Sequence, residues 1–309
     1  MTAVAAIGEV GLIQRMRRHV ACPASVLVGI GDDAAVLRLS RQQRGGKPGE
    51  HLLFASDMLI EGVHFRRDTL QPRWIGWKAL ACNVSDIAAM GGVPRYAVVS
   101  LGLPRQTPVQ FVDGLYEGLS RCAKRFGVAI VGGDTVRAPC VIVDVAIIGS
   151  VLASRLVLRS GAKIGDRIFV TGRLGGSLVS QRHATFTPRL REAQWLVKHL
   201  AVHAMIDLSD GLASDLWQLA RASHVTLQVT ERAIPVARVA KTAWHALMEG
   251  EDFELLFVVP PQHASRVPRR IGQVPVTEIG IVTKRGAGVL LCHNNGRIAR
   301  LTPSGFRHF

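Results

Sequence analysis

The chain has 309 residues, 48% of them hydrophobic, which is enough for two globular domains with their own cores. Its 38 lysines and arginines outnumber 23 acidic residues, giving a formal charge of +15. Because the basic residues are spread along the chain and only 6% of residues are aromatic, a primary role in nucleic-acid binding is disfavoured. The longest apolar stretch, residues 141–153, contains Asp144 and is shorter than the ~20 residues of a membrane-spanning helix. No membrane-bound protein is expected.

The first twenty residues carry Glu9 inside their apolar part and have their arginines behind it, which predicts an amphipathic helix of the mature protein rather than a secretory signal. The five cysteines are odd in number, widely spaced and without a C-x-x-C pair. Neither a disulfide framework nor a zinc site is therefore expected, and the predicted compartment is the cytoplasm.

Apolar, strand-like runs alternate with helical patterns along the first half of the chain. Strands are expected at residues 25–31, 52–57, 96–103, 128–133 and 140–152, and helices at residues 74–90 and 109–127. This order is typical of an α+β or α/β unit with a mixed sheet.

A turn with two glycines near residues 150–165 separates a second series. There, strands are expected near residues 167–172, 225–230, 253–259, 276–282 and 288–292, and helices near residues 189–200 and 211–222. We therefore predict two domains, residues 1–152 with a mixed sheet and residues 153–309 with an α/β fold.

Four apolar strands run straight into an acidic residue, in the segments GIGDD, FASD, IVGGD and MIDLSD. A single aspartate after a strand commonly starts a turn or caps a helix, and Ser209 or Asp210 could cap the helix after MIDLSD. Four such segments are more than turn formation explains. Since strand ends collect at a sheet edge, these carboxylates could converge in space.

The helix expected at residues 74–90 is apolar almost all round, which indicates burial, and Gly91-Gly92 marks its end. Asn83 and Asp86 lie on one face of it, and a buried aspartate needs a cation or strong donors. Several of these carboxylates lie near glycine-containing turns, which can bind phosphate. This combination favours Mg²⁺, a hard cation that is commonly bound by carboxylates and substrate phosphates together. The chain contains neither a Walker A motif nor the protein-kinase signature set.

The order and spacing of eight segments resemble those of bacterial thiamine-monophosphate kinases over nearly the whole chain: GIGDDAAVL, SDMLIEGVHF, KALACNVSDIAAMGGVP, VGGDT, RSGAKIGD, IDLSDGLASDL, GEDFELLF and GFRHF. That family belongs to the superfamily of aminoimidazole ribonucleotide synthetase, formylglycinamidine synthetase and selenophosphate synthetase, in which dimers bind ATP with several magnesium ions. The resemblance implies a homodimer formed through the sheet of an N-terminal ATP-binding domain. The C-terminal domain would complete the nucleotide and substrate site.

The resemblance also implies a reaction, the direct in-line transfer of a phosphoryl group from ATP to thiamine monophosphate, with no residue acting as a covalent nucleophile. Carried over residue by residue, it assigns Mg²⁺ binding to Asp33, Ser56, Asp57, Asp86, Asp134, Asp207 and Asp210. It assigns ATP binding to Tyr116, Gly133, Asp134, Arg159 and Ser209, and binding of thiamine monophosphate to His64, Glu251 and Phe306.

Two alternatives stay open at this point: another ATP-dependent synthetase of the superfamily, and a non-catalytic basic protein that binds nucleotides or nucleic acid. The sequence also departs from the family pattern. Ala55 stands where a hydroxyl residue is frequent, Gly176 replaces the aspartate of LGDS, and Glu249 replaces the first glycine of GGED. The segment between residues 180 and 205 is shorter than usual.

Overall fold

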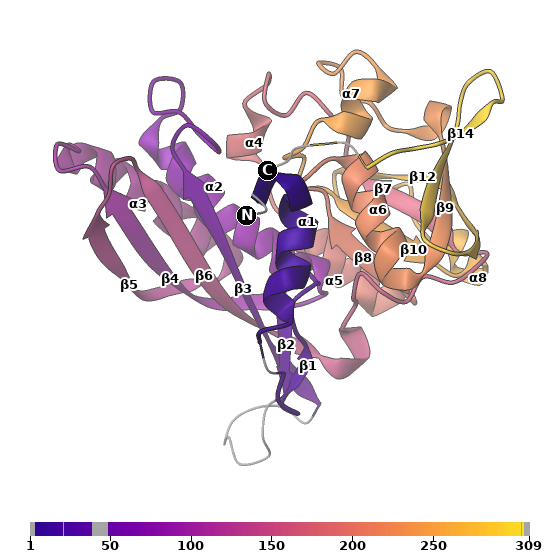
Figure 1. Cartoon of the computed structure of the whole chain (residues 1–309), viewed down its shortest axis with the longest axis horizontal. Helices are drawn as coiled ribbons and strands as arrows, with labels where there is room; N and C mark the ends of the chain where they lie inside the picture. The colour runs from indigo at the N-terminus through magenta and orange to yellow at the C-terminus, as the bar shows by residue number, and fades with distance from the viewer. Residues whose placement is uncertain (1–3, 21, 39–48, 304, 306–309) are drawn as a thin grey trace.

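Two β-sheets, one from each half of the chain, organise the protein and lie side by side (Figure 1). The structure is a computed structural model and describes residues 4–20, 22–38, 49–303 and 305. A helix is present at the N-terminus as α1 (Val4–Arg17), but it has a break in helical geometry at Gly8 and exposes Ile7, Val10 and Met16, so the expected amphipathic pattern is not found.

The first sheet has the strand order β1-β2-β3-β6-β4-β5. Its central pairs are antiparallel, and β3 matches β6 along its whole length, from Glu50 opposite Leu152 to Ile60 opposite Ile142. At one edge β5 runs parallel to β4, so the sheet is mixed, as expected. The strands are β1 (Val26–Val28), β2 (Ala35–Arg38), β3 (Glu50–Ile60), β4 (Val93–Leu103), β5 (Ala129–Arg137) and β6 (Ile142–Leu152).

Helices α2 (Pro72–Ala89) and α3 (Val109–Phe126) cover one face of this sheet. The two helices approach closely because each has a glycine at the contact: a Cβ on Gly76 would lie 1.9 Å from the carbonyl oxygen of Leu115, and one on Gly118 would lie 1.8 Å from that of Arg73. The helix α2 is buried on nearly all sides and ends at Ala89, with Gly91 in left-handed conformation just after its C-cap Met90, which confirms the predicted burial and the stop signal at Gly91.

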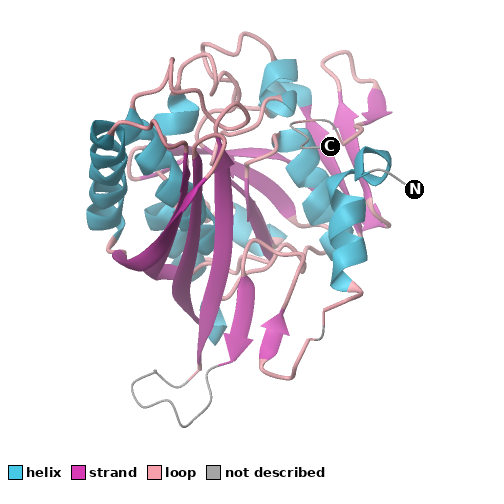
Figure 2. Cartoon of the chain, turned by 60° about the vertical axis from the view of Figure 1, so that its left-hand side comes forward, coloured by secondary structure: helices cyan, strands magenta, loops and turns pink. Residues whose placement is uncertain are grey.

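Within the described part of the chain, no helix covers the opposite face of the first sheet, whose strands are seen from the front in Figure 2. Side chains alternate along β3, so that Leu53 and Leu59 lie in the core while their neighbours point outward. Large apolar side chains exposed from these strands are Phe54, Met58, Tyr96, Val98 and Ile148. We call this surface the open face.

The second sheet has the order β14-β13-β9-β12-β7-β10-β8, with β11 paired to β12. All of its pairs are antiparallel except β13 with β9. The strands are β7 (Arg167–Thr171), β8 (Ala204–Asp207), β9 (Val225–Thr230), β10 (Leu255–Val259), β11 (Arg270–Ile271), β12 (Val274–Arg285), β13 (Gly288–Cys292) and β14 (Ile298–Arg300).

Helices cover both faces of the second sheet. On one face α6 (Leu212–Ser223) packs against β8, β9 and β13. On the other, Ala193 and Leu196 of α5 (Leu190–His199) share a core with Phe257 of β10 and with Ala88 and Ala89 at the end of α2. The remaining helices are short: α4 (Arg182–Thr185), α7 (Ala243–Met248), α8 (Pro261–Ala264) and the 3₁₀ turns η1 (Ala153–Arg155) and η2 (Glu231–Ala233).

Side chains from the second half also enter the core of the first. Phe186 and Phe253 stack with ring centroids 4.0 Å apart and belong to the same apolar cluster as α2. The indole N–H of Trp77 donates a 2.7 Å hydrogen bond to the carbonyl oxygen of Phe186. The predicted two-domain, mixed α and β architecture is confirmed, whereas the boundary at residue 152 stays a prediction. Among the described residues, no helix is long and apolar enough to cross a membrane.

Candidate functional site

A cluster of carboxylates lies where the two halves of the molecule meet. Asp33 comes from the loop between β1 and β2, Asp86 from α2 and Asp207 from the end of β8. One oxygen of each lies within 4.8 Å of the others. Asp57, on the core side of β3, shares a hydrogen bond with Asp86. The structure therefore brings together four carboxylates that the sequence places far apart.

Burial and mutual repulsion make these carboxylates hard to ionise without a counter-charge. Burial, reinforced by the charge of Asp33, raises the pKa of Asp207 from 3.8 to about 8. Burial also raises the pKa of Asp57 to about 6, and burial together with Asp57 raises that of Asp86 well above its ordinary value. Within the described residues, Oδ2 of Asp33 is buried and has no hydrogen-bond partner. Hard oxygen donors in this arrangement fit Mg²⁺.

Arg159 is the principal cation beside this cluster. Its Nη2 donates a 2.7 Å hydrogen bond to Oδ1 of Asp33, and its backbone N–H donates to both carboxylate oxygens of Asp32 at 3.2 Å. Asp32 also accepts a 3.1 Å hydrogen bond from the backbone N–H of Asp33. Of the two adjacent aspartates, Asp32 thus holds the backbone and Asp33 faces the cluster.

Gln218 of α6 connects Arg159 to the loop before this helix. Its Oε1 accepts a 2.6 Å hydrogen bond from Nη1 of Arg159, while its Nε2 donates to Asp210 at 3.1 Å and to Asp215 at 3.4 Å. Gln218 was not predicted, because one glutamine on an amphipathic helix carries no signal in the sequence. Its position three residues after Asp215, on the same helical face, is the feature that could have drawn attention to it.

The segment around Asp210 differs from the expected helix start. The N-cap of α6 is Gly211, and no side chain caps the helix, so neither Ser209 nor Asp210 is the cap. The carbonyl oxygen of Ser209 instead accepts a 2.7 Å hydrogen bond from the backbone N–H of Glu251. The backbone of Ser209 is thus joined to the turn that carries Glu251, and the carboxylate of Asp210 is held by Gln218.

His64 lies in the turn that follows β3, and its Nδ1 accepts a 3.0 Å hydrogen bond from the backbone N–H of Ile60. Its carbonyl oxygen accepts a 2.9 Å hydrogen bond from Nζ of Lys78, which also pairs with Oε1 of Glu251 at 2.5 Å. Two residues predicted from separate motifs, His64 and Glu251, thus meet through a lysine that sequence reasoning missed.

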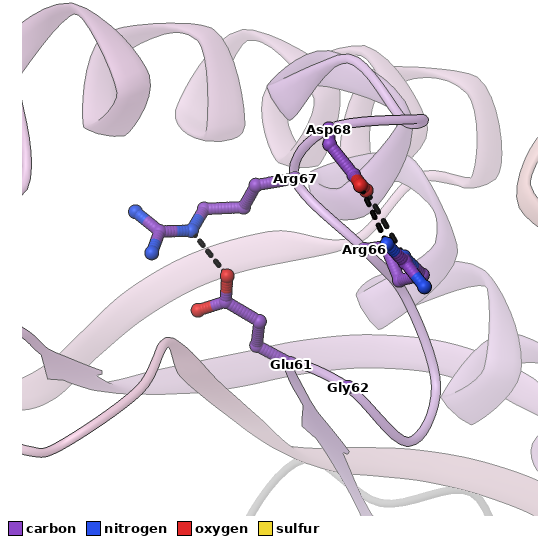
Figure 3. A pocket seen from close by; sticks show the side chains of 5 residues that line it. All are labelled: Glu61, Gly62, Arg66, Arg67 and Asp68. Carbon is purple, nitrogen blue, oxygen red and sulfur yellow. Dashed lines mark hydrogen bonds and ion pairs between the residues drawn. The ribbon is translucent and has the colours of Figure 1, made fainter.

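Next to His64 the same turn forms a surface pocket (Figure 3) lined by Glu61, Gly62, Arg66, Arg67 and Asp68. Arg67 and Glu61 form an ion pair at 2.5 Å, and Arg66 pairs with Asp68 at 2.6 Å. Each arginine already pairs with a carboxylate, so its charge is largely neutralised. The pocket is therefore a polar surface next to His64 and not a binding site for an anion.

The turn that carries Glu251 has an unusual backbone. Glu251 has a φ of 62° and Phe253 a φ of 48°, both in the left-handed region that non-glycine residues rarely adopt. Hydrogen bonds hold the turn in place: Ser177 Oγ donates to the carbonyl oxygen of Glu251 at 2.7 Å, and the N–H of Phe253 donates to the carbonyl oxygen of Leu208 at 2.7 Å. Such strain is frequent at functional sites, where the surrounding structure enforces it.

Several predicted site residues lie away from the cluster within one chain. The hydroxyl of Ser56 is on the open face, where it donates a 3.0 Å hydrogen bond to Asp144. Gly133 and Asp134 are on the edge strand β5, which β6 and β4 separate from β3. Three strand spacings amount to about 14 Å. Tyr116 is on α3 and 37% exposed.

Phe306 lies outside the described residues. Its neighbour Gly305 is packed against the loop before α6, because a Cβ on Gly305 would lie 2.1 Å from the carbonyl oxygen of Asp210. The chain therefore returns to the candidate site close to its C-terminal end.

Comparison with known proteins identifies relatives along nearly the whole chain. Residues 31–151 match the family described as AIR synthase related protein, N-terminal domain, and residues 163–293 match its C-terminal domain. The thiamine-monophosphate kinase of Rhodopirellula baltica is 37% identical over 92% of each chain. That of Bacillus subtilis is 33% identical over 97% of this chain and 99% of its own.

Solved structures of thiamine-monophosphate kinases have the same fold as this chain. One described as AaThiL complexed with AMPPCP and TMP is 30% identical, with a TM-score of 0.85 over 100% of this chain and 99% of that one. The thiamine-monophosphate kinase of Stenotrophomonas maltophilia K279a is also 30% identical, with a TM-score of 0.73 over 93% and 96% of the two chains. From its sequence, its two sheets and the carboxylate cluster between them, this chain belongs to the thiamine-monophosphate kinase family.

Proposed function

We propose that this protein transfers the γ-phosphoryl group of ATP to the phosphate of thiamine monophosphate, giving thiamine diphosphate and ADP. The observation that supports this most directly is the meeting of three features at one junction. They are the carboxylate cluster around Asp86, the guanidinium of Arg159 and the pair formed by His64 and Glu251. Relatives named thiamine-monophosphate kinase match more than nine-tenths of the chain.

The carboxylates are assigned to magnesium ions that accompany ATP. Asp33, Asp57, Asp86 and Asp207 would hold these ions, with Asp210 as a further ligand beside Arg159. When bound, Mg²⁺ neutralises phosphate oxygens and the charge that develops during transfer. Arg159 is placed to bind a phosphate through its planar guanidinium, with Asp33 and Gln218 fixing its orientation.

The chemistry requires little from side chains beyond positioning and charge. An oxygen of the substrate phosphate attacks the γ-phosphorus, and the bond between that phosphorus and the bridging oxygen of ADP breaks. The attacking phosphate is already ionised near neutral pH, so no strong general base and no covalent nucleophile are required. Holding the two phosphates in line supplies much of the rate.

The thiamine end of the substrate is assigned to His64, Glu251 and Phe306. A carboxylate and an aromatic ring suit a cationic heteroaromatic ligand. Glu251 lies in a turn that hydrogen bonds hold rigidly, and Gly305 places the segment before Phe306 against Asp210. These contacts support a substrate site at the same junction.

We also propose that the protein is a homodimer that buries its open face. Exposed Phe54, Met58, Tyr96 and Ile148 form an apolar surface of the kind that protein partners cover. Since β5 is distant from the cluster in its own chain, Gly133 and Asp134 would serve the nucleotide bound at the second copy.

We propose a cytoplasmic location, which is supported by the described cysteines because all of them are unpaired.

The direct test is an assay of ADP release with ATP, Mg²⁺ and thiamine monophosphate, with the product identified by mass spectrometry. ADP should form only when thiamine monophosphate is present, and thiamine, which lacks the attacking phosphate, should give none. No release above the ATP-only rate would contradict the proposed function. Release with a different acceptor would favour another synthetase of the superfamily.

A further inference from the structure

Lys78 is a fully buried cation at the junction of the two halves of the molecule. Its side chain is 0% exposed, although lysine is almost never completely buried unless it is paired. It lies in the middle of α2, where a positive charge among Ile75, Ala79 and Leu80 would be costly without partners. The position therefore calls for a specific explanation.

The two partners of Lys78 come from different halves of the protein. One is the backbone carbonyl of His64, in the turn after β3, and the other is Oε1 of Glu251, in the strained turn before β10. One ammonium group thus connects the turn after β3 with the turn before β10, and no sequence motif links these two turns. Its pairing with Glu251 also leaves that carboxylate with a defined orientation.

Stability alone is a weak reason for such a pair. Replacing a buried ion pair by apolar side chains of similar volume is often neutral or stabilising, whereas removing one partner leaves an uncompensated charge. The pair at Lys78 differs from a structural ion pair in one respect, because both of its partners are residues assigned to the substrate.

We propose that Lys78 is a positioning residue for thiamine monophosphate, acting through His64 and Glu251 without touching the substrate. It fixes the turn of His64 relative to the carboxylate of Glu251, so that the two sides of the substrate site keep a constant separation before the substrate arrives. The inference rests on the proposed function. It adds that specificity for the thiamine end depends on a residue outside the set that contacts it.

The test is a double-mutant cycle of Lys78→Met and Glu251→Gln, with steady-state kinetics for both substrates. Lys78→Met should raise KM for thiamine monophosphate about tenfold, the effect of losing one hydrogen-bonded charge contact, and leave KM for ATP within about twofold. The double variant should be no worse than the more impaired single variant, because both substitutions break the same contact. Lys78→Gln keeps an N–H donor and should show a smaller rise in KM than Lys78→Met.

Arg189→Met is the matched control, because it also removes a cation from a buried carboxylate. Arg189 binds Glu254 through two hydrogen bonds of 2.6 Å and contacts neither His64 nor Glu251. It should lower the melting temperature while KM for thiamine monophosphate is kept. If Lys78→Met does not fold, KM for thiamine monophosphate is compared instead between the unmodified protein, Lys78→Gln and the Lys78→Met/Glu251→Gln double variant. The double variant buries no unpaired charge.

The outcomes separate this inference from the proposed function. If the unmodified protein releases no ADP with thiamine monophosphate, the proposed function is wrong. If it is active, the inference is overturned by an unchanged KM for thiamine monophosphate in the Lys78 variants. It is equally overturned by a rise in both KM values together, or by fully additive effects of the Lys78 and Glu251 substitutions.

Discussion

The backbone N–H of Gly176 donates a hydrogen bond to the carboxylate of Glu249. The resemblance of the sequence implies an aspartate at position 176 and a glycine at position 249, where this chain has Gly176 and Glu249. A Cβ at Gly176 would lie 2.3 Å from Cγ2 of Val239, and the φ of 72° at this position favours glycine. The carboxylate of Glu249 thus contacts the loop at the position where the resemblance implies an aspartate.

This contact predicts that the two positions are coupled. Gly176→Asp should lower the free energy of unfolding by about 1–3 kcal/mol, because the new side chain meets Val239 and its charge faces Glu249. Adding Glu249→Gly should restore part of that loss, since it removes the repulsion. Thermal unfolding of both single variants and the double variant measures the coupling, and losses that simply add would contradict it.

The adjacent aspartates of the first loop should differ in their contribution to turnover. Asp33→Asn removes a charge that faces the cluster and should lower kcat by roughly two orders of magnitude, or about 3 kcal/mol of transition-state stabilisation. Asp32→Asn keeps an oxygen for the N–H groups of Arg159 and Asp33 and should retain much of the activity. Measuring kcat across a Mg²⁺ series, with circular dichroism as the folding control, decides between them. A larger loss for Asp32→Asn would reverse the assignment.

The carboxylate of Asp207 should make the stability of the metal-free protein depend on pH. Its pKa is raised from 3.8 to about 8, chiefly by burial and then by the charge of Asp33. Between about pH 4 and pH 8 the folded state therefore holds a proton that the unfolded state has lost, so the free energy of unfolding falls as pH rises. Asp207→Asn lacks this proton and should show a smaller fall when both proteins are denatured with chelator present.

Magnesium should oppose this trend. Ions bound by the ionised cluster stabilise the folded state, and they should raise the melting temperature more at pH 8 than at pH 5, because fewer protons must be displaced. The asparagine variant serves as the control for the metal effect. A stabilisation by Mg²⁺ that is the same at both pH values, or the same in the variant, would argue against a metal site at Asp207.

Gln218 should influence ATP more than thiamine monophosphate. Gln218→Leu removes the acceptor of Nη1 of Arg159 and the donor to Asp210, and the loss of about 1 kcal/mol should raise KM for ATP roughly fivefold. KM for thiamine monophosphate should change little. Steady-state kinetics with each substrate varied in turn provide the measurement. A selective rise in KM for thiamine monophosphate would show that Gln218 supports the thiamine side of the site and not the ATP side.

A mixture of two inactive variants should recover activity if a site is shared between copies. In a dimer of one Asp33→Asn chain and one Asp134→Asn chain, one site collects both substitutions and the other keeps both native residues. Equal mixing after reversible dissociation should therefore restore about one quarter of the native activity, as expected for twofold symmetry. Each variant alone is the control. No recovery, despite mass-spectrometric evidence for mixed dimers, would place Asp134 outside the shared site.

The sequence was informative wherever local chemistry decides structure. The strand-end positions of Asp33 and Asp207 and the buried character of α2 led to the expectation of converging carboxylates, and the structure brings Asp33, Asp86 and Asp207 together but leaves Asp134 on the edge strand β5. The partners of those residues were not predictable in the same way. Lys78 meets Glu251 across 173 positions of sequence, and Ser85 donates a 2.6 Å hydrogen bond to Asp207 across 122. Such contacts depend on how the two halves dock, which no local pattern encodes.

The open face illustrates a second limit. Alternation along β3 predicts which residues share a side, yet it leaves open which side the helices cover, because Phe54 and Met58 are as apolar as the residues of the core. Only the packing of α2 shows that Ser56 lies on the uncovered side and Asp57 on the core side.

The stacking of Phe186 on Phe253 has a consequence for how the chain acquires its structure during synthesis. A ribosome that has completed the first half has released α2 before the groups that surround it exist. The indole of Trp77 then lacks the carbonyl of Phe186, and the ammonium of Lys78 lacks its counter-charge until Glu251 emerges. The apolar core around α2 therefore becomes complete only after Phe186 and Phe253 have been synthesised.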